Sequence, residues 1–159
     1  MIQRIQTLHL LIATILLSLM LIFPLSTFVC GEQDVTLKAF GANLGTEGIA
    51  NLPLYLGVVI VAATLLPFIT IFLYKRRMLQ IRLCGVEIAL AVGVLVFEAI
   101  YIYLTNNMLV EWHAAMQQPV AINLGIVAFA PIVAIFFVVL AMRATLRDEL
   151  LVRSLDRIR

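Results

Sequence analysis

Long apolar runs alternate with short polar segments along the whole chain. Four such runs cover approximately residues 7–29, 52–74, 83–104 and 120–142, and only the third holds charged side chains. An α-helix rises about 1.5 Å per residue, so a run of this length crosses the roughly 30 Å hydrocarbon core of a bilayer. The pattern predicts an all-α membrane protein, residues 1–159, with a single domain of four transmembrane helices.

The first apolar run has a second interpretation as a cleavable signal peptide, because Arg4 precedes it. The run is longer than the roughly 7–15-residue core of a signal peptide, and an A-x-A cleavage pattern is missing. Retention as a span is therefore the favoured interpretation, with cleavage as the alternative. Either way, the other three helices would keep the same orientation.

The segments between the runs are short or rich in turn-forming residues. Residues 30–51 carry glycines at four places and no long apolar run, so they are predicted to form a loop. Only the basic segment 75–82 separates the second and third runs, which makes those two helices antiparallel neighbours. Residues 105–119 are predicted to form a polar loop with Trp112 as an anchor at headgroup level.

Two of the runs contain an internal proline. Pro67 lies inside the second run and Pro131 near the middle of the fourth, and each is predicted to kink its helix. A proline also frees a backbone carbonyl in the preceding turn. We expect Thr64 or Thr70 to satisfy the carbonyl that Pro67 frees.

The C-terminal tail, residues 143–159, places leucines at helical spacing opposite charged residues. This spacing predicts an amphipathic cytoplasmic helix. It either continues the fourth helix into water or bends to lie on the membrane surface.

Composition supports a membrane environment, since 64% of the residues are hydrophobic and 13% are charged. A soluble domain is about 45–50% apolar and about 25% charged. So many apolar side chains exceed what the interior of a chain this small can hold, so lipid must contact much of the surface. The basic residues lie beside the spans, where they orient the protein, and they give no sign of nucleic-acid binding.

The positions of the basic residues predict the orientation. If the N-terminus is cytoplasmic, Lys38 is the one Lys or Arg that lies outside. The cytoplasmic segments then hold Arg4, Lys75, Arg76, Arg77, Arg82, Arg143, Arg147, Arg153, Arg157 and Arg159. Positive charge concentrates on the cytoplasmic side of inner-membrane proteins, so both termini are predicted to be cytoplasmic. Guanidinium groups in these segments also suit carboxylates and anionic lipid headgroups.

The two cysteines, Cys30 and Cys84, fall at opposite faces of the bilayer in this topology. A disulfide needs Cα atoms within about 7 Å, so the two thiols of one chain are not expected to pair. There is also no CxxC pair, which excludes the disulfide-exchange class of membrane enzymes. Both cysteines are interpreted as small apolar residues.

Two carboxyl groups in the third run are the candidate intramembrane polar site. Glu98 lies deep in the run, where a charge costs on the order of 2.5–3.5 kcal/mol. It escapes that cost by staying protonated or by facing donors such as Asn123 or Tyr101. Glu87 lies five residues beyond Arg82, so it is expected to pair with the basic segment or to extend to the membrane surface.

Helical geometry divides the third run into two faces. At 100° per residue, Glu87 and Glu98 lie within about 20° of each other. The small residues Gly85, Ala89 and Gly93 lie on the opposite face, and their spacing is the one that lets membrane helices approach closely. The chain covers both faces only if this helix is central in the bundle. Otherwise one face is left for another protein.

Sequence motifs of several enzyme and cofactor classes are missing. The chain lacks G-x-S-x-G, a phosphate-binding Walker loop, H-E-x-x-H and a Gly-rich dinucleotide turn. His9 and His113 fall on opposite sides of the bilayer, so one chain cannot clamp a haem between them. Glu111 and His113 are too few for a metal site. We therefore expect no catalytic centre, metal or cofactor.

Three stretches together resemble a known family: MIQRIQTL at the start, YKRRMLQIRLC in the middle and LRDELLVRSLDRIR at the end. They are similar to small four-pass inner-membrane proteins from Bacteroidetes whose function is unassigned. The resemblance covers the whole chain. It implies a bacterial inner membrane and four spans, and it brings no catalytic residues.

Two functional hypotheses follow. The first is a non-catalytic accessory or structural subunit of a larger inner-membrane assembly, with other membrane subunits as partners and protein export or envelope biogenesis as candidate hosts. The alternative is a small transporter or proton-coupled carrier that uses Glu98.

Overall fold

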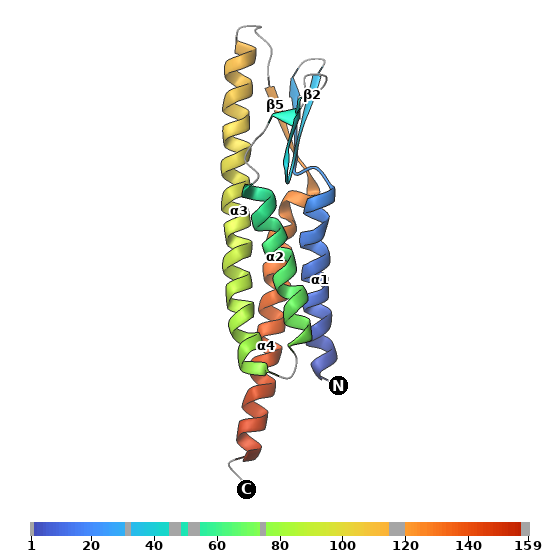
Figure 1. Cartoon of the computed structure of the whole chain (residues 1–159), viewed down its shortest axis with the longest axis vertical. Coiled ribbons are helices and arrows are strands. Elements are labelled where there is room, and N and C mark those ends of the chain that lie inside the picture. Colours follow the sequence, from blue (N-terminus) through green and yellow to red (C-terminus); the bar gives the residue numbers. More distant parts are fainter. Residues whose placement is uncertain are drawn as a thin grey trace.

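The computed structural model describes residues 2–30, 33–44, 49–50, 55–73, 76–114 and 120–156. Four long helices form an antiparallel bundle (Figure 1): α1 (Ile2–Ile22), α2 (Tyr55–Phe72), α3 (Arg77–Ala114) and α4 (Ala130–Asp156). Each helix packs against two others, because α1 and α3 both contact α2 and α4. The two termini lie at the same end of the bundle (Figure 1).

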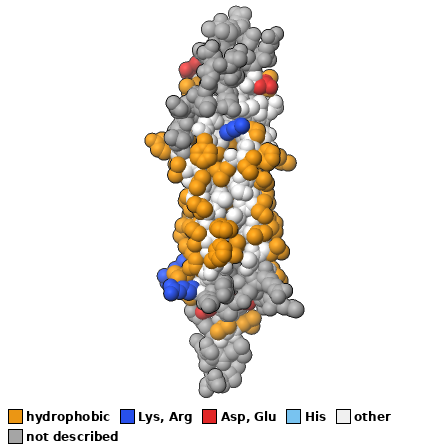
Figure 2. Space-filling model, turned by 45° about the vertical axis from the view of Figure 1, so that its right-hand side comes forward, with side chains coloured by type: hydrophobic (Ala, Val, Ile, Leu, Met, Phe, Trp, Pro, Cys, Tyr) orange, Lys and Arg blue, Asp and Glu red, His pale blue; other side chains and the backbone are white. Residues whose placement is uncertain are grey.

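All four helices are long and apolar enough to cross a membrane, which confirms that part of the prediction. The segments that meet this criterion are Ile5–Ile22, Tyr55–Phe72, Met78–Glu111 and Ile126–Val152. Hydrophobic side chains form a broad band across the middle of the face shown in Figure 2. Lys and Arg side chains gather at its lower edge, and basic side-chain atoms also lie at its upper edge. An apolar band bordered by cations is the surface expected of a chain that crosses a bilayer.

The fold is mostly helical, as predicted, but it is not all-α. The described residues also form a five-stranded antiparallel sheet at the end of the bundle opposite the termini (Figure 1). Its order is β4-β3-β2-β1-β5. The strands are β1 (Ser26–Cys30), β2 (Gln33–Lys38), β3 (Gly41–Leu44), β4 (Ile49–Ala50) and β5 (Val120–Leu124). The expected loop 30–51 therefore contains three of these strands and the last residue of β1. The first and fourth apolar runs each contribute one more strand.

The sequence pattern did not predict the strands at the ends of two apolar runs, for a physical reason. The segments STFVC and VAINL are short and include β-branched residues, so hydropathy alone does not distinguish a strand there from a turn of helix. Their pairing, with Phe28 opposite Ile122, joins segments far apart in the sequence. A prediction made from a short stretch of sequence cannot include a contact between segments so far apart.

The sheet packs on the bundle through one face. Phe28, Val35, Leu37 and Ala42 share this face and are buried. α3, with 38 residues, is about 57 Å long, so it extends well beyond a 30 Å membrane core. Its far half runs beside the sheet (Figure 1), and both β1 and β5 contact it.

Two glycines allow close contact where the sheet joins the bundle. A Cβ on Gly125 would lie 2.6 Å from the Pro24 carbonyl oxygen, and the Gly125 amide donates a 2.8 Å hydrogen bond to the Leu25 carbonyl. A Cβ on Gly57 would collide with the Phe40 ring. Side chains at these positions would force the sheet away from the helices.

One internal proline lies inside its helix as predicted, and the other does not. Pro131 lies in the first turn of α4 and not at its middle, so the predicted mid-helix kink was wrong; the first turn tolerates a missing N–H. Pro67 does lie inside α2. The Thr64 and Thr70 hydroxyls donate to the carbonyls of Ile60 and Leu66, so neither satisfies the carbonyl four residues before Pro67.

The remaining element boundaries shift as well. α3 runs from Arg77 to Ala114, so Arg82 lies within the helix and not in a link. The prediction of a loop over residues 105–119 was wrong for 105–114, which are helical, and residues 115–119 lie outside the described residues. α4 continues without a break into the tail as far as Asp156. Thr145 and Asp148 of this tail are buried, whereas Leu146, Leu150 and Leu151 are exposed. These three leucines therefore do not form an inward-facing apolar surface.

Candidate intramembrane site on α3

One face of α3 is buried along almost the whole helix, and four of its nine buried side chains are polar. The buried positions recur every three or four residues, which keeps them on one side of a helix. They are Gln80, Cys84, Glu87, Ala91, Val94, Glu98, Tyr101, Thr105 and Leu109. The two carboxyl groups share this face, as the helical angles predicted. We call this set the polar stripe of α3.

Glu87 is the most enclosed member of the polar stripe. Its side chain is 0% exposed, and neither carboxyl oxygen has a hydrogen-bond partner among the described residues. The prediction that Glu87 pairs with the basic segment or extends to the surface was wrong. Arg82 is exposed, and it lies about 140° around the helix from Glu87, so the two side chains leave α3 in different directions.

Glu98 lies three turns farther along α3 and is 3% exposed. Its Oε1 atom has no hydrogen-bond partner within the described part of the chain. About 16.5 Å of helix separates it from Glu87, and Ala91 and Val94 occupy the buried face between them. The polar stripe is therefore not a continuous path of protonatable groups along α3.

Asn123, the predicted donor to Glu98, is not brought to it. Asn123 belongs to β5, where it is exposed and lies opposite Thr27 of β1. Side chains alternate between the two faces of a strand, so Asn123 and Thr27 lie on the sheet face opposite to Phe28. Asn123 thus points away from the buried interface of sheet and bundle, and its assignment to the Glu98 site was wrong.

The small residues of α3 lie on its open face. Gly85 and Ala89 are exposed and Gly93 is half-buried. A Cβ built on Gly85 or Gly93 would meet no described atom within 4 Å, apart from the helix itself and the neighbouring residues. Since α3 packs against α2 and α4 through its polar stripe, the small-residue face stays open toward the other described residues at Gly85 and Gly93.

The basic residues gather at the end of the bundle that holds the termini. Arg76 and Arg82 of the α3 segment and Arg147 of α4 are exposed. Arg77 and Arg153 are described in their backbone only, and Lys75 and Arg157 lie outside the described residues.

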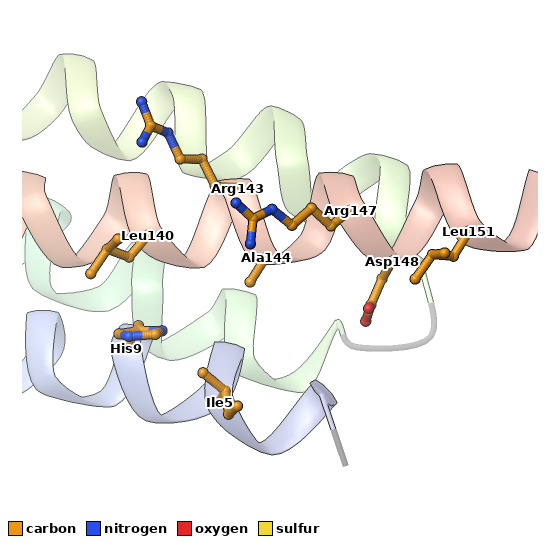
Figure 3. Close-up of a pocket in the computed structure, with 8 residues that line it drawn as sticks. All are labelled: Ile5, His9, Leu140, Arg143, Ala144, Arg147, Asp148 and Leu151. Atoms are coloured by element: carbon orange, nitrogen blue, oxygen red, sulfur yellow. The ribbon is translucent and has the colours of Figure 1, made fainter.

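A cleft between α1 and α4 opens near these basic residues (Figure 3). Its volume is about 430 Å³. Ile5 and His9 line it from α1; the α4 side consists of Leu140, Arg143, Ala144, Arg147, Asp148 and Leu151. Sequence reasoning missed this site, because no local pattern shows that the start of α1 packs on the end of α4.

A buried hydrogen bond joins the two helices that form the cleft. The Gln6 amide Nε2 donates to Asp148 Oδ2 at 3.0 Å, joining the first turns of α1 to the last turns of α4. The His9 ring lies 6.0 Å from the Phe137 ring, measured between centroids. The buried His9 Nδ1 atom has no hydrogen-bond partner in the described structure. The cleft thus combines fixed polar groups with apolar walls.

The described residues contain no cluster of three or more His, Cys, Asp or Glu side chains that could hold a metal ion. Cys84 is a free, buried thiol on the polar stripe, toward the end of the bundle where the termini lie, whereas Cys30 belongs to the sheet at the other end.

Comparison with known proteins places the chain in a family. A family model described as a domain of unknown function, DUF4293, matches residues 2–158. A search of curated proteins found no match. Because the family model covers nearly the whole chain, including all four helices and the sheet, this protein belongs to the DUF4293 family.

Proposed function

We propose that this protein is a non-catalytic accessory or structural subunit of a larger assembly in a bacterial inner membrane. The observation that carries the proposal is the open small-residue face of α3. Gly85, Ala89 and Gly93 would let a second helix approach closely, and the chain's own helices pack on the other side. A face of this kind suits a helix of another membrane subunit.

The distribution of charge supports an orientation for this subunit. The termini and the exposed arginines share one end of the bundle, and the sheet occupies the other. In the proposed orientation both termini are cytoplasmic, with the sheet on the outer side. The inner membrane of Bacteroidetes is the proposed location, on the resemblance of the terminal and central motifs. Export or envelope-biogenesis machinery is the proposed host.

The experiment purifies tagged protein from native membranes in mild detergent and identifies what accompanies it by mass spectrometry. Ala89→Leu places a large side chain on the open face of α3. Ala62→Leu makes the same change at an exposed position of α2 and is the matched control. We expect Ala89→Leu to release the partner and Ala62→Leu to retain it. Migration of the unmodified protein as a lone 17.7 kDa chain would refute the proposal.

A second candidate, a proton-coupled carrier, is favoured by one observation. Glu87 is fully buried with both oxygens lacking a hydrogen-bond partner among the described residues, and an intramembrane carboxyl group of this kind is a common feature of proton pathways. In this case Glu87→Gln and Glu98→Gln would abolish proton-driven uptake in reconstituted vesicles while the amount of folded protein stays the same. If Glu98→Leu is instead stabilising and harmless to growing cells, the carrier hypothesis fails.

A further inference from the structure

We propose that the cleft between α1 and α4 is a binding site for an anionic phospholipid, with the lipid phosphate held by Arg147 and Arg143. The site is distinct from the polar stripe and from the open face of α3. It depends on neither functional candidate above, because it uses other helices and another end of the bundle.

The geometry of the cleft suits a lipid that enters from the side of the bundle. His9 and Ile5 line the cleft from α1, while Leu140 and Leu151 of α4 line the opposite wall (Figure 3). The volume of about 430 Å³ lies in the range of small-molecule sites, about 300–1,000 Å³. Its mostly apolar walls would accommodate the glycerol backbone and the first methylenes of an acyl chain.

The charges of the cleft suit a phosphate. Arg147 runs back along α4 over Ala144, so its guanidinium lies at the mouth of the cleft (Figure 3). Arg143 is exposed and points away from α1, and its long flexible stem can bring the guanidinium to the rim. A guanidinium group forms two parallel hydrogen bonds to phosphate oxygens. These two groups outweigh the one carboxylate of the lining, Asp148, which already accepts a hydrogen bond from Gln6.

The depth of the cleft favours a lipid over a soluble anion. Leu140 lies within the apolar part of α4, and Asp148 and Leu151 lie toward its charged end. The cleft therefore crosses the level where hydrocarbon meets headgroups, with cations at the polar side. Basic pockets between membrane helices at this level recognise anionic headgroups.

Native mass spectrometry of the full chain in detergent tests the site with two probes, phosphatidylglycerol and phosphatidylcholine. We expect phosphatidylglycerol adducts to exceed phosphatidylcholine adducts. Arg147→Gln and Arg143→Gln should each weaken phosphatidylglycerol binding about fivefold. This is about the change in Kd that one basic side chain near an anionic headgroup contributes. Arg82→Gln is the matched control, because Arg82 is an exposed arginine outside the cleft.

A second variant separates shape from charge. Ala144→Phe fills the wall of the cleft without altering any charge, and it should also lower phosphatidylglycerol binding. Arg147→Lys keeps the charge and should retain more binding than Arg147→Gln. That result would show that the loss in Arg147→Gln comes from the missing charge and not from misfolding. Equal binding of both lipids, equal losses in Arg147→Gln and Arg82→Gln, or displacement of phosphatidylglycerol by inorganic phosphate at millimolar concentration would each overturn the proposal.

Discussion

Replacement of Glu87 by methionine should stabilise the isolated protein. The carboxyl group is 0% exposed and both oxygens lack hydrogen-bond partners in the described structure. Burial of an unsatisfied polar group costs about 1–3 kcal/mol. Methionine is unbranched and similar in length, so it can fill the same space with an apolar chain. The free energy of unfolding should therefore rise by about 1–3 kcal/mol.

The assay is equilibrium unfolding in mixed micelles at neutral pH, with increasing denaturing detergent and helical circular dichroism as the signal. Glu87→Gln keeps the size and the polar atoms, so its gain should be smaller than that of Glu87→Met. Ile88→Met is the control, because Ile88 is a half-buried neighbour and an apolar exchange of similar volume usually changes stability by less than about 1.5 kcal/mol.

The reasoning would be refuted by a loss of stability in Glu87→Met that Ile88→Met does not share. Such a loss would mean that the carboxyl group gains more from a partner in the folded protein than its burial costs. A bound water molecule or a cation would then have to lie beside it.

Three further predictions concern packing. Gly125→Ala should lower the free energy of unfolding by about 1–3 kcal/mol, because its Cβ would lie 2.6 Å from a backbone oxygen. Gly93→Ala is the control: its Cβ would point into open space, so in the same unfolding assay it should be neutral or stabilising by up to about 1 kcal/mol. Gln6→Leu should lower the free energy of unfolding by about 1–2 kcal/mol, because it removes the buried 3.0 Å hydrogen bond to Asp148. Asp148→Asn should lower it less, since the amide oxygen of asparagine can still accept that hydrogen bond. Cys84, which is 0% exposed, should resist a water-soluble maleimide in the folded protein and react after denaturation, as peptide mass spectrometry would record; rapid labelling of the folded protein would contradict its burial.

Helical periodicity was the most successful part of the sequence reasoning. The angles at 100° per residue put Glu87 and Glu98 on one face of the third helix and Gly85 and Ala89 on the opposite one. The structure buries the first pair and exposes the second. A straight helix has a known geometry, so this separation needs no knowledge of neighbouring elements.

The partners of these residues could not be predicted in the same way. Glu87 was expected to reach the basic segment because the two are close in sequence, yet it lies between packed helices. Asn123 was expected to lie on a helix facing Glu98, yet its segment pairs with β1 as a strand. Both predictions depended on long-range contacts.

The sequence by itself determined that four segments are long and apolar enough to cross a membrane, because bilayer thickness and helical rise set that length independently of the fold. It also determined the two faces of the third helix. Only the tertiary structure decided which face the chain covers, since that depends on α3 contacting α2 and α4. The tertiary structure also decided the pairing of β1 with β5 and the α1–α4 cleft, because each joins segments that lie far apart in the sequence.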